Sequence, residues 1–162
     1  KLLSAAQRGE VVGQIKEATT DWAIGNASVE EIDAMNIRQA ALLAMRRAVE
    51  GLRIVPEFVL VDAFQIPGLA MPVKNIIRGD RYVKSIAAAS IIAKVARDEY
   101  LEKLAEEFPG YGFAAHKGYG TKQHHEALHR LGPCAVHRKT FAPIKALLVM
   151  QKDERESIPQ YP

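Results

Sequence analysis

The chain has 162 residues, of which 48% are hydrophobic and 25% charged, a composition that fits one soluble globular domain and excludes a disordered chain. The formal net charge of +3 and the isoelectric point of about 9.0 mildly favour an anionic partner such as nucleic acid. A single cysteine, Cys134, excludes an internal disulfide and, with apolar stretches too short to cross a bilayer, predicts a cytoplasmic protein with no membrane contact.

The first elements are predicted from capping residues and apolar spacing. Ser4 is a favoured N-cap for a helix over residues 5–18. Residues 21–25 (DWAIG) have the pattern of a short buried strand. Ser28 and Glu31 are spaced as a capping box and predict a short helix that begins there.

The middle of the chain predicts a helix followed by strands. Asn36 is expected to cap a helix that ends at Gly51. Residues 57–62 (EFVLVD) form an apolar run rich in β-branched residues, which predicts a strand buried on both faces. A second strand is expected at residues 73–77.

The last part of the chain predicts helices separated by glycine-rich loops. A helix is expected to begin at Asp80 and to continue as far as Glu107, before Pro109-Gly110. Residues 111–120 are predicted to be a loop, and Thr121 to cap a helix that ends at Gly132-Pro133. Residues 142–150 predict a final amphipathic helix.

Strands separated by helices predict a layered α/β fold. No linker is long enough to divide the chain into independent domains. We expect an α/β core over residues 1–108, a helical, substrate-binding part of the same domain over 109–150, and a polar tail over 151–162.

The segment HHEALHRLG contains a formal match to the zinc-peptidase pattern H-E-x-x-H, formed by His125, Glu126 and His129. A zinc site needs a third protein ligand. The position for a third histidine is Ala135, and His137 lies two residues too late. We therefore interpret the pattern as the solvated face of a helix and reject the peptidase.

Two aspartates, Asp62 and Asp80, are candidate metal ligands. Asp62 closes the strand FVLVD, and ligands bind at the carboxyl ends of strands in α/β sheets. A divalent cation would offset the desolvation of a carboxylate there, although Asp62 is equally compatible with a simple turn. Asp80 reads either as a helix N-cap or as a second metal ligand that faces Asp62.

The loop HKGYGTK (residues 116–122) combines lysines, glycines and a tyrosine. Glycines allow the backbone to approach a ligand, lysines attract phosphate, and an aromatic ring stacks on a sugar or base. A basic surface loop with no ligand would have the same composition, so this pattern alone leaves both interpretations open.

Four segments together resemble type 2 ribonuclease H (ribonuclease HII). They are KLLS, VLVDAF, GDRYVKSIAAASIIAKVARDEY and FPGYGFAAHKGYGTKQHHEALHRLGPCAVHRKTFAPI, which occur in the order of the family and extend from Lys1 to Ile144. The long blocks AAASIIAKVARDEY and YGFAAHKGYGT make the resemblance specific.

This resemblance implies a ribonuclease-H-like fold, a mixed sheet flanked by helices with a C-terminal helical part. It also implies a monomeric endoribonuclease that cleaves the RNA strand of RNA–DNA hybrids and incises duplex DNA at embedded ribonucleotides. In the family four acidic residues hold Mg²⁺ or Mn²⁺, and two of them match Asp62 and Asp80.

The resemblance also assigns nucleic-acid contacts. The tyrosine that contacts the sugar at the RNA–DNA junction matches Tyr119. Lys117 and the segment His137-Arg138-Lys139 are expected to contact phosphate.

The first part of the family's site has no counterpart in this sequence. The family begins with an Asp-Glu pair on its first strand, followed by a Gly-Arg-Gly segment that helps to read the 2′-hydroxyl, and neither is present. We expect these elements, and the first strands of the sheet, to lie upstream of Lys1. The alternative is a catalytically inactive fragment that binds hybrids.

Overall fold

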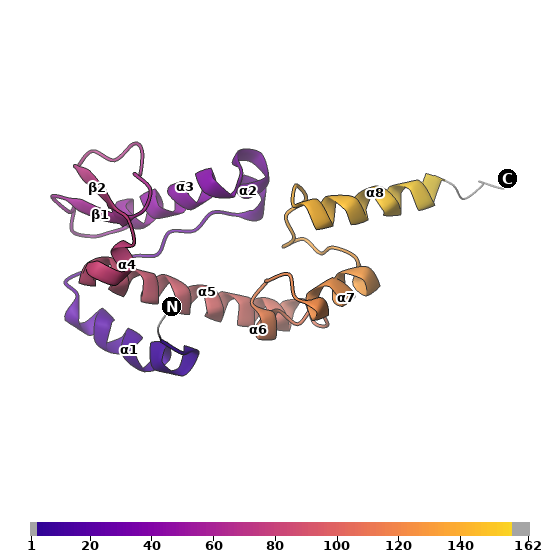
Figure 1. Cartoon of the computed structure of the whole chain (residues 1–162), viewed down its shortest axis with the longest axis horizontal. Coiled ribbons are helices and arrows are strands. Elements are labelled where there is room, and N and C mark those ends of the chain that lie inside the picture. Colours follow the sequence, from indigo (N-terminus) through magenta and orange to yellow (C-terminus); the bar gives the residue numbers. More distant parts are fainter. Residues whose placement is uncertain (1–2, 157–162) are drawn as a thin grey trace. The chain divides into compact units, whose positions relative to one another are not determined.

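The computed structural model describes residues 3–156 and contains eight helices and two strands within them (Figure 1). The helices are α1 (Ala5–Ala18), α2 (Val29–Met35), α3 (Ile37–Glu50), α4 (Gly79–Tyr82), α5 (Lys84–Glu107), α6 (Phe113–His116), α7 (Lys122–Leu131) and α8 (Ala142–Glu156). The strands are β1 (Val59–Asp62) and β2 (Val73–Ile76). The described residues form two compact units, one of residues 3–28 and 35–99 and the other of residues 29–34 and 100–156. The expected division at residue 108 stays a prediction.

Two of the capping residues expected in the first unit, Ser4 and Asn36, are confirmed. The Ser4 hydroxyl accepts the N–H of Gln7, and the Gln7 side chain accepts the N–H of Ser4, which completes a capping box at the start of α1. The Asn36 side chain accepts the N–H groups of Arg38 and Gln39 and caps α3. These contacts satisfy N–H groups that the first turn of a helix leaves without a partner.

The strand expected at residues 21–25 is wrong, because this segment belongs to no regular element. Its ends are held by side chains instead of by a neighbouring strand. The Asp21 carboxylate accepts the backbone N–H groups of Arg53 and Ile54 and the guanidinium of Arg53. The guanidinium of Arg47, in α3, donates to the carbonyl of Asn26. Gly25 lies against the backbone of α3, whereas Trp22 and Ile24 are 41% and 48% exposed, so the apolar pattern does not mark a buried strand.

We expect the substitution Gly25→Ala to destabilise the first unit by about 1–3 kcal/mol, the usual cost of overpacking. A Cβ atom at Gly25 would lie 2.0 Å from the Ala44 carbonyl oxygen and 2.5 Å from the Ala48 nitrogen, and helix backbone cannot move aside cheaply. Urea unfolding measures the change. Gly13→Ala in α1 is the control, because a Cβ there meets nothing within 4 Å and alanine favours a helix. Equal stabilities of the two variants would contradict the prediction.

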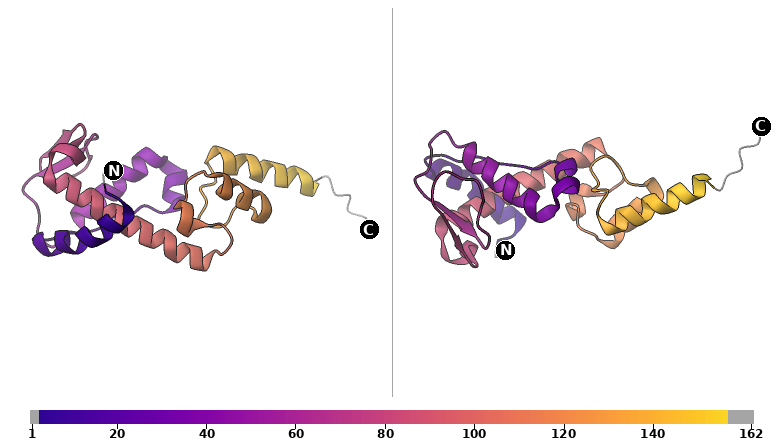
Figure 2. Two further views of the ribbon diagram at one scale, coloured as in Figure 1. Left: turned by 60° about the horizontal axis from the view of Figure 1, so that its bottom comes forward. Right: turned by 90° about the horizontal axis from the view of Figure 1, so that it is seen from above.

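The strands β1 and β2 form a parallel pair in which Val59 is opposite Val73 and Asp62 is opposite Ile76. They lie side by side in both views of Figure 2. One face packs against apolar side chains that include Val49 of α3. The expectation that β1 is buried on both faces is wrong, because Leu60, on the opposite face, is 39% exposed. Within the described residues the sheet has only two strands, and no element covers that face.

The helix expected from Asp80 to Glu107 is divided in two. The single turn of α4 starts after Arg78, so Asp80 lies in its first turn and is not its N-cap. Val83 then adopts an extended backbone, and α5 begins at Lys84. A β-branched residue favours the extended conformation, which gives a local reason for the break.

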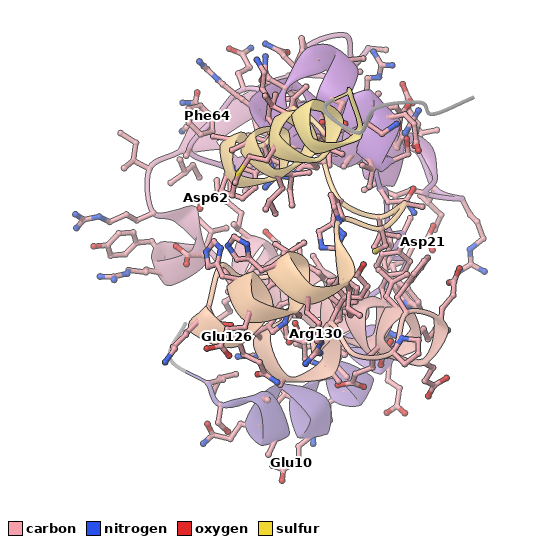
Figure 3. All side chains as sticks on the ribbon, turned by 90° about the vertical axis from the view of Figure 1, so that its right-hand side faces the viewer. Glu10, Asp21, Asp62, Phe64, Glu126 and Arg130 are labelled. Carbon is pink, nitrogen blue, oxygen red and sulfur yellow. The ribbon has the colours of Figure 1, made fainter. Side chains whose placement is uncertain are left out.

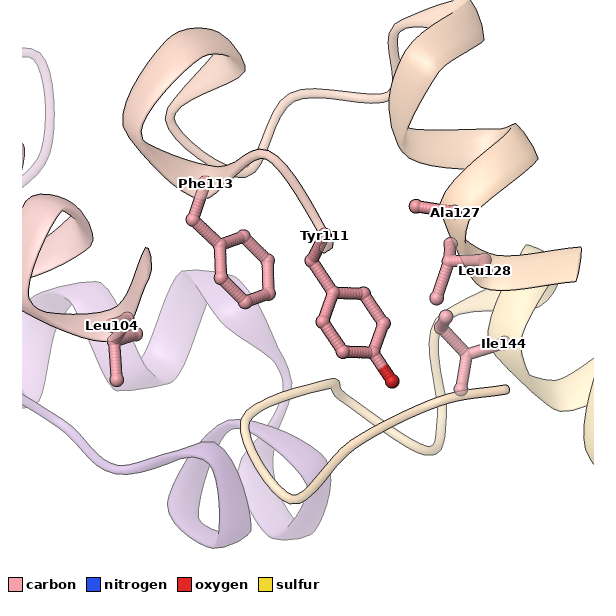
Figure 4. Close-up of a cluster of buried hydrophobic side chains, with 6 residues drawn as sticks. All are labelled: Leu104, Tyr111, Phe113, Ala127, Leu128 and Ile144. Atoms are coloured by element: carbon pink, nitrogen blue, oxygen red, sulfur yellow. The ribbon is translucent and has the colours of Figure 1, made fainter. Parts of the chain in front are cut away.

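The second unit is built around an apolar cluster (Figure 4). Its buried members are Leu104, Tyr111, Phe113, Ala127, Leu128 and Ile144. The rings of Tyr111 and Phe113 stack with centroids 5.4 Å apart. The Tyr111 hydroxyl donates to the carbonyl of Gly132 at 2.7 Å, and burial raises the pKa of this hydroxyl. The cluster therefore fixes both the start of the loop after α5 and the end of α7.

Two boundaries in the second unit differ from expectation. Residues 111–120 are not wholly irregular, because α6 forms one turn between Gly112 and Lys117, both in the left-handed region. Helix α8 extends to Glu156, since the residues after Met150 are good helix formers. The remainder of the expected polar tail, residues 157–162, lies outside the described residues. Thr121 caps α7 as predicted, and Gly132 ends it.

Within residues 3–156, no helix combines the length and the apolar character that a membrane span requires.

Candidate active site

Asp62 lies at the carboxyl end of β1, where the sequence predicted a ligand site. Its side chain is partly buried, and Oδ1 accepts the N–H of Gly79 at 2.8 Å. Asp62 is the last residue of β1 and is labelled in Figure 3 together with Phe64. The hydrogen bond fixes the carboxylate against the turn that begins α4, and Oδ2 is left available for a ligand.

Asp80 follows directly after the residue that donates to Asp62. Helix α4 contacts β1, so Asp80 lies on the turn whose Gly79 N–H is bonded to Asp62. The Asp80 side chain makes no hydrogen bond or ion pair with other described residues, although the residue is partly buried. Gly79 is buried, and a Cβ there would lie 2.6 Å from Cδ1 of Ile86, so a larger residue would require the Ile86 side chain or this turn to move.

Unusual backbone conformations accompany both aspartates. Ala63, directly after Asp62, has φ 60°, and Arg78, two residues before Asp80, has φ 56°. The N–H of Phe64 donates to the Asp62 carbonyl at 2.7 Å, and the Asn75 side chain donates to the Ala63 carbonyl. Residues other than glycine adopt this region at a cost of about 1–2 kcal/mol, and such residues gather at functional sites. The neighbouring hydrogen bonds hold the chain in these conformations.

The side chains of Asp62 and Asp80 are of the type that binds a divalent cation. Carboxylate oxygens are the ligands that Mg²⁺ and Mn²⁺ prefer. Among the described residues, no three histidine, cysteine, aspartate or glutamate side chains are grouped as metal ligands. That Asp62 and Asp80 are two ligands of a larger set stays a prediction.

The loop of residues 116–122 carries Tyr119, whose side chain is 61% exposed. Lys117 has φ 49°, and its ammonium forms an ion pair with Glu102 of α5. A phosphate would have to displace Glu102 from Lys117, whereas the tyrosine ring is accessible. The loop thus presents an aromatic ring more readily than a free cation.

The segment His137-Arg138-Lys139 is the second place where a phosphate contact was expected. The Asp33 carboxylate, in α2, accepts the N–H groups of Lys139 and Thr140 and the Thr140 hydroxyl, and these bonds lower the pKa of Asp33. The Arg138 guanidinium lies 4.7 Å from the centroid of the Phe141 ring. Asp33 thus anchors the backbone of this turn and leaves the Lys139 side chain exposed.

His137 does not belong to this basic surface. It is 8% exposed, and burial lowers the pKa of its imidazole, so the expectation that its side chain contacts phosphate is wrong. His116 and His124, each 7% exposed, are buried with it. Sequence reasoning missed this cluster, because the three residues share no spacing that marks them as neighbours.

The residues of the zinc-peptidase pattern, His125, Glu126 and His129, lie on α7 and are all exposed. Figure 3 labels Glu126 on this helix. Glu126 is 3.7 Å from the ammonium of Lys122, one helical turn earlier. This arrangement agrees with a solvated helix face.

Comparison with known proteins gives concordant results. The sequence model of the family described as Ribonuclease HII matches residues 1–144. A curated protein named Ribonuclease HII, from Myxococcus xanthus (strain DK1622), is 49% identical over 148 residues, which are 91% of this chain and 50% of that protein. The chain thus spans about half the length of this relative.

A solved structure gives the same fold. The ribonuclease H2 from Pyrococcus horikoshii OT3 matches with a TM-score of 0.76 and 22% sequence identity, over 93% of this chain and 79% of that one. The expected ribonuclease-H-like α/β fold is therefore confirmed, with two parallel strands of its sheet in the described residues.

Proposed function

Because the chain belongs to the ribonuclease HII family, we propose that the protein containing it is a metal-dependent endoribonuclease. It hydrolyses the RNA strand of RNA–DNA hybrids and incises duplex DNA at embedded ribonucleotides. The observation that carries the proposal is the turn in which Gly79 donates to Asp62 and is followed by Asp80. Mg²⁺ or Mn²⁺ as the metal, a monomeric state and a cytoplasmic location belong to the same proposal.

Asp62 and Asp80 would hold the cation as ligands and would not carry protons themselves. A bound divalent cation supplies a water nucleophile at neutral pH and offsets the charge that develops on the leaving 3′-oxygen. The N–H of Gly79 holds one oxygen of Asp62 and so limits rotation of the carboxylate. Because the 3′-oxygen is the leaving group, hydrolysis gives 5′-phosphate and 3′-hydroxyl ends.

The Tyr119 ring would contact the sugar at the RNA–DNA junction, and its 61% exposure supports this role. Arg138 and Lys139, together with Lys117 once Glu102 is displaced, would contact phosphates and add affinity without sequence preference. Affinity for duplexes should therefore fall as the salt concentration rises.

An end-labelled duplex with one embedded ribonucleotide tests the proposal. We expect incision at the ribonucleotide with Mg²⁺ or Mn²⁺, none with EDTA, and none of an all-DNA duplex. The other candidate is a hybrid-binding module without catalysis, favoured by the presence of only two matching carboxylates in the sequence. Salt-dependent binding of the hybrid without cleavage would support that candidate and overturn the enzyme.

We expect Tyr119→Ala to lower incision at a single ribonucleotide by about 10-fold relative to cleavage of a continuous hybrid, since an aromatic contact to a nucleotide contributes about 1–3 kcal/mol. The measurement is the ratio of kcat/KM for the two substrates. Tyr100→Ala is the control, because Tyr100 is also exposed, at 56%, but lies on α5. An unchanged ratio for Tyr119→Ala would remove this residue from junction recognition.

A further inference from the structure

The buried histidines hold the backbone of the loop that carries Tyr119. Nδ1 of His116 accepts the N–H of Gly118 at 3.2 Å, and the His116 carbonyl accepts the N–H of Tyr119 at 2.9 Å. Nδ1 of His124 lies 3.0 Å from the carbonyl oxygen of Tyr119. His137 reaches the loop through His124, since their Nε2 atoms are 3.1 Å apart.

The partners of each ring fix where its hydrogen lies. His116 donates from Nε2 to the Tyr111 carbonyl at 2.7 Å, because Nδ1 accepts from Gly118. His124 must donate from Nδ1, since a carbonyl can only accept, and its Nε2 then accepts. Nδ1 of His137 accepts the N–H of Cys134 at 3.0 Å, so Nε2 of His137 carries the hydrogen and donates to His124. One arrangement, with all three rings neutral, satisfies these bonds, and the Cys134 Sγ also lies 3.1 Å from Nδ1 of His137.

We propose that His124, held in its Nδ1–H tautomer by His137, is a positioning residue that orients Tyr119 for recognition of the ribonucleotide sugar. The recognition step rests on the function proposed above for Tyr119. The orienting step does not, because it concerns the backbone of the loop alone.

The loop has a shape that must be held by such bonds. Lys117 and Gly118 adopt consecutive left-handed conformations, with φ 49° and 76°, and lysine pays about 1–2 kcal/mol for this. The Tyr119 carbonyl accepts from two donors, Nδ1 of His124 and the N–H of Thr121 at 2.8 Å. Both donors belong to the start of α7, since Thr121 is its N-cap and accepts the N–H of His124. The position of Tyr119 is thus set from the rigid helix that follows it.

Two variants of His124 separate this role from simple packing. In His124→Asn the amide nitrogen takes the place of Nδ1 and can still donate to the Tyr119 carbonyl. In His124→Gln the amide takes the place of Nε2, and that donor is lost. His129→Asn and His129→Gln are controls, because His129 is exposed on the same helix.

The first measurement is affinity for a metal-free duplex with one embedded ribonucleotide, relative to an all-DNA duplex. We expect His124→Gln to lose about 3- to 10-fold of this preference, the change that one hydrogen bond produces, and His124→Asn to retain most of it. Equal losses in both variants would overturn the positioning role. Absence of any preference in the unmodified protein would instead count against the proposed function.

The second measurement needs no substrate. Imidazole ¹⁵N shifts should show hydrogen on Nδ1 of His124 and on Nε2 of His116 and His137. Amide exchange of Gly118 and Thr121 should accelerate in His124→Gln and not in His124→Asn. A different tautomer of His124, or equal exchange in both variants, would overturn the proposal whatever the activity of the protein.

Discussion

The substitution Asp62→Asn should lower metal-dependent cleavage by about 10³-fold, because a ligated cation contributes several kcal/mol to the transition state and each 1.4 kcal/mol is a factor of ten. Asparagine keeps the oxygen that accepts the N–H of Gly79, so the turn at the end of β1 stays in place. What it removes is one carboxylate of the proposed metal site. The effect should therefore fall on metal binding and catalysis and leave folding almost unchanged.

Three measurements on the protein that contains this chain define the result. Cleavage of a duplex with one ribonucleotide should fall, Mn²⁺ binding should weaken, and the urea midpoint should stay within the error of the unmodified protein. Asp98→Asn is a control, since Asp98 lies on α5 and pairs with Arg8 and Lys94. A variant with normal metal-dependent cleavage would exclude Asp62 as a ligand, and one that unfolds would assign Asp62 to stability.

Local signals in the sequence predicted the parts of the fold that local bonds determine. Ser4, Asn36 and Thr121 cap their helices as expected, because the hydrogen bonds of a cap join residues two or three apart. The position of Asp62 followed from the apolar strand before it. That Asp80 faces Asp62 was one of two interpretations of the residues, and the resemblance favoured it. The roles of Asp62, Asp80 and Tyr119 stay predictions.

Contacts between distant residues could not be predicted in this way. The segment at residues 21–25 has the composition of a strand, but Gly25 lies against the backbone of α3 and no strand pairs with it. His116, His124 and His137 come together only because α6, α7 and the turn after Cys134 fold around Phe113. In the sequence His116 belongs to a basic loop and His137 to a basic segment. Both are buried, so neither side chain has the exposed, basic character that composition suggested.

The histidine cluster also predicts a loss of stability in mild acid. Burial lowers the pKa of both His124 and His137 below the ordinary value of 6.5, and their hydrogen bonds require neutral rings. Nearby His116 and His125 oppose a charge on His124, and His116 and His124 oppose one on His137. In the unfolded chain both rings take up a proton near pH 6.5, so stability is full above that pH and falls as the pH drops.

Each histidine that is protonated only in the unfolded state adds a slope of about 1.4 kcal/mol per pH unit, so the two together add at most about 3 kcal/mol per unit. Urea unfolding between pH 7.5 and 5 measures this slope. His124→Asn should reduce it, and His129→Asn, at an exposed position, should not.

The loss of stability from the two histidines falls in a different pH range from that of the other groups whose pKa is shifted. Asp21 and Asp33 have a lowered pKa, owing mainly to side-chain bonds from Arg53 and Thr140, so their contribution is lost only as the pH falls below 3.8. Burial raises the pKa of the Cys134 thiol above 9.0, so its contribution is lost only as the pH rises past that value. A stability that stays constant from pH 7.5 to 5 would mean that His124 and His137 are protonated equally in the folded and unfolded chains. The single neutral arrangement of the three rings would then be wrong.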